Sequence, residues 1–166
     1  QRQMCIRDSI MREPIVITSD DPILKSLKFK PHRNTERRRV VSFAPADDEP
    51  QTMEVVTPWG ARLTAKKGDM LVSEIDSPED IWPVDADIFD KSYIIVSPGY
   101  CIKSAVTMLV PLTDLTDGDE DQLVTVQSLE GPETVRAGDF FLAKGVKDEL
   151  WPYPKHKAAE VKSPVE

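Results

Sequence analysis

The chain is poor in the residues on which most metal and enzyme chemistry depends. Its 166 residues include two cysteines, two histidines and seven glycines. Two cysteines are too few for a disulfide framework or a four-thiolate zinc site. Seven scattered glycines form no phosphate-binding loop. Long apolar runs are also absent, so we expect no transmembrane helix and no membrane partner. These shortages predict no metal, no cofactor and no catalytic residue.

Acidic residues are in excess, and they are concentrated in the later part of the chain. Residues 51–166 carry eleven Lys or Arg against twenty-one Asp or Glu. A globular body with this charge repels nucleic-acid phosphates and stays in solution. We therefore do not expect this part to bind nucleic acid. Low cysteine content favours a reducing, cytoplasmic location.

The first fifty residues differ in composition. We expect residues 1–10 to be a non-native or disordered leader, because they show neither helical nor strand periodicity. Seven basic residues and one acid in 25–39, followed by prolines and acids, predict a basic arm and a linker over residues 11–50. The arm either contacts nucleic acid or another anionic partner, or is a solvated linker. The scarcity of interleaved aromatic residues favours the linker.

An internal repeat is the strongest pattern in residues 51–166. Two dipeptides recur at separations of 70 and 69 residues: Gly68-Asp69 with Gly138-Asp139, and Trp82-Pro83 with Trp151-Pro152. Around them each copy has three short β-rich runs separated by tight turns. The copies span about residues 53–93 and 122–162, and residues 94–121 join them.

A duplicated three-stranded unit predicts a mainly β fold, a compact roll or small barrel with one or two short helices. We expect helices over Asp85–Tyr93, capped by Asp85, and over Lys155–Lys162. In each Gly-Asp turn the glycine is expected to adopt a positive φ and the aspartate to cap the turn. The Trp of each Trp-Pro pair is expected to close one end of its unit.

Each copy resembles the PGDYG-motif family of small bacterial and phage proteins. The resemblance covers about half of the chain and rests on Ser128–Gly131, Ala137–Phe140, Lys67–Met70, Trp82-Pro83 and Asp87–Tyr93. It implies a phage-associated protein, located in the host cytoplasm, with no established activity. It implies no catalytic residues.

Three other features have a structural and a functional interpretation. The acids of 114–121 could form a calcium loop, but EF-hand spacing is absent and a solvated turn is expected. The acid pairs Glu79-Asp80 and Asp148-Glu149 recur at equivalent positions, which favours a structural role over acid-base catalysis. Cys101 stands between Tyr100 and Ile102 and is expected to be a buried thiol.

The aromatic residues provide the remaining candidate site. These residues could form a pocket at the seam between the copies that stacks a small planar anion such as a nucleotide, but the burial statistics of aromatic side chains favour packing of the Trp residues in the core. The candidate ligand-binding residues are Trp59, Arg62, Trp82, Tyr93, Arg136, Trp151 and Tyr153. Lys66 and Lys67, near the first Gly-Asp turn, are further candidate cations.

These observations support three functional hypotheses. The first is a non-enzymatic binding or interaction module, phage-associated, for which self-association is left open. The second is a protein that sequesters a nucleotide-like ligand at the repeat seam. The third, with least support, is a small hydrolase that uses the paired acids.

Overall fold

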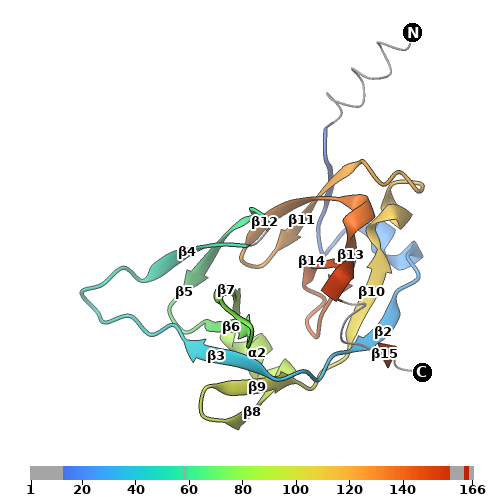
Figure 1. Cartoon of the computed structure of the whole chain (residues 1–166). Helices are drawn as coiled ribbons and strands as arrows, with labels where there is room; N and C mark the ends of the chain where they lie inside the picture. Colours follow the sequence, from blue (N-terminus) through green and yellow to red (C-terminus); the bar gives the residue numbers. More distant parts are fainter. Residues whose placement is uncertain (1–12, 58, 158–162, 165–166) are drawn as a thin grey trace.

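The described part of the chain is built mainly from β-strands. The computed structural model describes residues 13–57, 59–157 and 163–164, and the expected leader over 1–10 lies outside them. Figure 1 shows short strands that belong to several sheets, with one short helix, α2, next to β6 and β9 in this view. The predicted mainly β fold with short helices is confirmed, although the strands form separate sheets and no closed barrel.

Sheet I is five-stranded and antiparallel. Its order is β7 (Ser77–Val84), β6 (Met70–Glu74), β3 (Arg38–Ser42), β9 (Tyr100–Lys103) and β8 (Tyr93–Ser97).

Sheet II repeats this arrangement strand for strand. Its order is β14 (Leu150–Pro154), β13 (Phe140–Lys144), β10 (Thr107–Pro111), β2 (Lys30–Arg33) and β15 (Ser163–Pro164). The matching strand order includes two strands, β3 and β10, that precede the predicted copies.

One hairpin accompanies each sheet. Hairpin I is β4 (Thr52–Val56) with β5 (Arg62–Lys66). Hairpin II is β11 (Leu123–Ser128) with β12 (Gly131–Arg136), and β1 (Ile15–Ile17) pairs with it in parallel. The hairpins meet where the Thr64 amide donates to the Glu130 carbonyl over 3.0 Å. The contact is close at Gly131, where a Cβ would stand 3.3 Å from the Arg62 carbonyl oxygen.

The helical elements are short. Helix α2 (Ala86–Ser92) confirms the first predicted helix, with the Asp85 side chain accepting from the amides of Asp87 and Ile88. Three 3-10 helices are η1 (Pro22–Ser26), η2 (Leu112–Leu115) and η3 (Ala137–Asp139). Residues 155–157 begin the second predicted helix as α-helix, and residues 158–162 lie outside the described residues.

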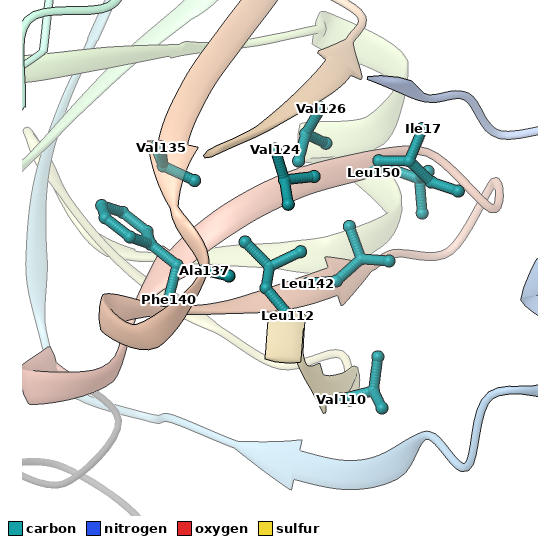
Figure 2. Close-up of a cluster of buried hydrophobic side chains, with 10 residues drawn as sticks. All are labelled: Ile17, Val110, Leu112, Val124, Val126, Val135, Ala137, Phe140, Leu142 and Leu150. Carbon is teal, nitrogen blue, oxygen red and sulfur yellow. The ribbon is translucent and has the colours of Figure 1, made fainter. Parts of the chain in front are cut away.

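Aliphatic side chains join each hairpin to its sheet. Val55 and Leu63 of hairpin I lie in one cluster with Leu71 and Ile81 of sheet I. The larger cluster joins hairpin II to sheet II, and Figure 2 shows its ten buried side chains converging from strands far apart in sequence. Among them are Val124, Val126 and Val135 of the hairpin. Burial of side chains of this size stabilises the fold by about 1.5–3 kcal/mol each.

The segment over residues 11–50 differs from the expected arm and linker. It supplies β2 and β3, which pair on both sides inside the two sheets. Strand β3 was not predicted because it lies in the basic run. In this strand Arg38 and Val40 are buried, while Arg39 and Val41 are exposed. This alternation is that of an ordinary half-buried strand, with an arginine at one of its inward positions.

The two Gly-Asp turns are not equivalent, which corrects one expectation. Gly68 has a φ of +97°, and buried Asp69 accepts from the Lys66 amide over 2.9 Å. Gly138 instead lies in η3, and the exposed Asp139 accepts from the Arg136 guanidinium over 3.0 Å. Only the first aspartate satisfies a backbone amide of its own turn.

This difference predicts unequal stability losses. Asp69→Ala leaves the Lys66 amide without its acceptor, and we expect the free energy of unfolding to fall by about 2 kcal/mol. Asp139→Ala removes an exposed ion pair, and the loss should stay below about 0.5 kcal/mol. Urea unfolding of both variants measures the difference. Equal losses would contradict the structural distinction between the turns.

Candidate functional site

A cavity of about 150 Å³ lies between the two halves of the repeat. Residues of both sheets and both hairpins line it. Five of the seven predicted ligand-binding residues are among them: Trp59, Trp82, Tyr93, Trp151 and Tyr153. An apolar cavity of about this volume is known to hold a benzene ring. The space therefore suits one aromatic ring system.

The repeated Trp residues reach the cavity because of strand alternation. Ile81 and Leu150 precede Trp82 and Trp151, and these aliphatic side chains pack in the clusters beneath hairpin I and hairpin II. Successive side chains of a strand point to opposite faces, so each Trp points away from its hairpin. The two indoles, which come from β7 and β14, thus line the same space.

Arg38 of β3 is the most unusual residue of the cavity wall. Its side chain is 7% exposed, and its Nε has no hydrogen-bond partner within the described residues. The guanidinium lies 5.8 Å from the centre of the Trp82 ring, and Nε lies 3.8 Å from Glu74 Oε1. A buried guanidinium N–H without a hydrogen-bond acceptor is costly, because water no longer solvates it. Arg38 is therefore placed to accept an anionic ligand.

Lys103, at the end of β9, is a second cation on the same wall. Its Nζ lies 4.6 Å from the centre of the Trp151 ring and 5.7 Å from that of Tyr93. Burial and the positive charge of Arg38 lower the pKa of Lys103 to about 8. An anion bound beside these two side chains would favour the charged form of the lysine.

Two glutamates from hairpin II form another part of the wall. Glu133 is 3% exposed, and one carboxyl oxygen accepts from the Trp59 indole over 3.1 Å. Burial raises the pKa of Glu133 to about 7. Burial and the negative charge of Asp69 raise the pKa of Glu130 to about 7 as well. Both carboxyls can therefore gain or lose a proton near neutral pH.

Sequence reasoning missed the arginine and both glutamates. One available signal was that Glu133 stands two residues before the buried Val135, at an inward position of a short strand. Such a position normally carries an apolar residue, so an acid there indicates a special role. Arg38 has the same signal relative to Val40.

The basic residues that the sequence analysis named as candidates lie outside the cavity. Arg62 pairs with Glu54 over 2.7 Å, and Arg136 pairs with Asp121 over 2.8 Å, both on the exposed surface. Lys66 and Lys67 pair with Asp69 and Asp47. These residues lie near the Gly-Asp turns, as the sequence predicted, but the turns face solvent.

The remaining candidates have simple structural positions. Of the paired acids Glu79, Asp80, Asp148 and Glu149, only Glu149 lines the cavity. Cys101 is a fully buried thiol in sheet I, as expected, and burial raises its pKa.

Within residues 13–57, 59–157 and 163–164, no cluster of three or more metal-ligating side chains is found. None of the helices in these ranges is long and apolar enough to span a membrane.

Comparisons with protein-family models, curated proteins and solved structures found no match to this chain. The resemblance to PGDYG-motif proteins stays a prediction.

The buried acid predicts a pH-dependent stability. Between about pH 4.5 and pH 7 the folded chain holds a proton on Glu133 that the unfolded chain releases. The free energy of unfolding therefore falls as the pH rises through this window. Glu133→Gln removes the contribution of Glu133 and leaves that of Glu130, so the free energy of unfolding of the variant should exceed that of the natural chain by up to about 3 kcal/mol at pH 8 and equal it at pH 4.5.

Urea unfolding at several pH values provides the measurement. Glu54→Gln is the matched control, because Glu54 lies on the exposed face of hairpin I. Parallel pH profiles for Glu133→Gln and the natural chain would show that Glu133 is not buried as described.

Proposed function

We propose that this chain binds a small planar anion, of the size of a single nucleotide base, in the cavity between its two halves. The observation that carries the proposal is the buried Arg38 guanidinium, whose Nε has no hydrogen-bond partner in the described part of the chain. A buried cation in the wall of an aromatic cavity suits an anionic ligand that binds in that cavity.

The chemistry of the wall supports this proposal. Indole and phenol rings offer flat apolar faces on which a planar ligand stacks, and stacking contributes about 1–3 kcal/mol per base in nucleic-acid-binding proteins. Arg38 and Lys103 provide positive charge beside those rings. A few converging polar groups in an aromatic cavity are typical of small-molecule sites. The function is sequestration, because binding alone accounts for these features.

Replacement of the arginine tests the proposal. Arg38→Met keeps the volume of the side chain and removes its charge, so affinity for a bound anion should fall roughly tenfold to hundredfold. The stability of the same variant without ligand should change little, since Glu74, the acid beside Arg38, keeps its ion pair with Lys157 over 3.5 Å. Quenching of Trp fluorescence by a panel of nucleoside monophosphates and aromatic carboxylates measures affinity, and urea unfolding measures stability.

Arg62→Met is the matched control, because Arg62 is exposed and pairs with Glu54. Its affinities should equal those of the natural chain. If no member of the panel quenches the fluorescence of the natural chain at millimolar concentration, ligand sequestration is wrong.

A second candidate function is self-association through β8. This strand is at the edge of sheet I within the described residues, and Ile94, Ile95 and Val96 are 52%, 51% and 42% exposed. An exposed apolar edge strand is a template for pairing with another strand. The partner we propose is β8 of a second copy, because two identical strands can pair antiparallel about a two-fold axis.

This arrangement predicts a concentration-dependent dimer. Ile95→Lys places a charge on the edge and should shift sedimentation equilibrium to the monomer. Ile75→Lys is the control, since Ile75 is also exposed but lies in the turn between β6 and β7. A natural chain that stays monomeric at all concentrations would exclude the β8 dimer.

A further inference from the structure

Lys103 of β9 stands in the cavity wall among aromatic rings and beside a second cation. Its Nζ lies 4.6 Å from the centre of the Trp151 ring and 5.7 Å from that of Tyr93. The strand register explains this position. Tyr93 of β8 pairs with Lys103, and Arg38 of β3 pairs with Cys101, two residues earlier in β9. Tyr93, Arg38 and Lys103 therefore share one face of sheet I, and all three line the cavity.

No acid holds this amine at close range. In the described part of the chain, Lys103 forms no ion pair with a carboxylate. Glu149 also lines the cavity, but its Oε1 accepts from the Lys147 amide over 2.8 Å. Arg38 stands diagonally across the strand pair, and Cβ atoms in this relation lie roughly 7 Å apart. Burial and the charge of Arg38 both favour the neutral amine, and they lower the pKa of Lys103 to about 8.

Lys157 provides an internal comparison, because it lines the same cavity. Its Nζ lies 5.0 Å from the centre of the Trp82 ring, and it pairs with Glu74 over 3.5 Å. An amine in an ion pair is an ammonium, which has no free electron pair. Of these two lysines, Lys103 is thus the one whose surroundings favour a nucleophile.

A lysine that is desolvated beside another cation forms Schiff bases with carbonyl compounds. We propose that Lys103 binds an aromatic aldehyde of one ring covalently, as a Schiff base inside the cavity. An aldehyde fits because its carbonyl condenses with a neutral amine and releases only water. One ring fits because an apolar cavity of about 150 Å³ holds a benzene ring. Trp82 and Tyr153 line the same space and provide further aromatic surface for that ring.

The proposed step is a condensation. The electron pair of Nζ attacks the carbonyl carbon, and the π electrons of the C=O bond move to oxygen. Two protons pass from nitrogen to that oxygen, which leaves as water, and the C=N bond forms. Nothing is oxidised or reduced, and no further reactant is required. This inference goes beyond the proposed function, because the condensation needs no anion.

Trapping of the Schiff base tests the proposal. The full chain is treated at neutral pH with benzaldehyde and sodium cyanoborohydride, which reduces the imine to a stable secondary amine, and peptide mass spectrometry locates the label. We expect Lys103 to be labelled roughly tenfold faster than Lys157 and the exposed lysines, because a larger fraction of its amine is neutral. Propanal, which has no ring to fill the cavity, should show a smaller preference for Lys103.

Two substitutions should change the labelling rate of Lys103 in opposite directions. Arg38→Met removes the neighbouring positive charge, so the amine is protonated more often and labelling should slow roughly threefold. Glu149→Gln removes the negative charge that favours the ammonium, so labelling should accelerate by about the same factor. Arg62→Met is the control, because Arg62 is exposed and pairs with Glu54, and it should leave the rate unchanged.

Equal labelling of Lys103 and the other lysines would overturn the proposal. The same conclusion follows if propanal and benzaldehyde show equal preference for Lys103, or if neither Arg38→Met nor Glu149→Gln changes the rate. These outcomes are independent of the proposed function, since the nucleoside monophosphates and aromatic carboxylates that test it carry no aldehyde. Anion binding can therefore fail while Lys103 is labelled, and labelling can fail while anions bind.

Discussion

The structure depends on how each hairpin covers its own sheet. Hairpin I buries Val55 and Leu63 against Leu71 and Ile81, and hairpin II does the same over a larger area of sheet II. Because one face of each sheet is covered in this way, the next side chain along β7 and β14 must point elsewhere. That side chain is a Trp in both strands, and both line the space between the halves. The position of both Trp side chains in the cavity wall therefore follows from strand alternation in β7 and β14.

The groups around this cavity oppose folding. Arg38, Lys103 and Glu133 all lose hydration in the folded chain; within the described residues Arg38 has Glu74 at 3.8 Å, and burial is the main cause of the shifted pKa of Lys103 and of Glu133. Stability must come from the aliphatic clusters, the largest of which lies beneath hairpin II (Figure 2). Proteins commonly keep destabilising residues where a ligand needs them. Because the destabilising charged residues lie at the cavity and the charged residues of the surface form ion pairs, we assign the function to the cavity.

Much of the architecture could be predicted from local patterns. The recurring Gly-Asp and Trp-Pro dipeptides predicted two similar units, and the aromatic residues near them line one cavity. The prediction was less successful for charged residues. Arg62 and Arg136 were chosen because they flank turns in the sequence, yet both pair with acids on the surface. Arg38 was assigned to a basic arm, although it is an inward residue of a central strand.

The sequence by itself determined the strands beside the two Gly-Asp turns, the helix that Asp85 caps and the order of the repeated anchors, because these depend on residues close together in the chain. Only the tertiary structure decided which charged side chains face inward. Strand pairing sets the face on which each residue lies, and a shift of one residue reverses it. Arg38 pairs with Glu74 of β6 and Cys101 of β9, two strands far from it in the sequence, so its burial could not be read from its neighbours.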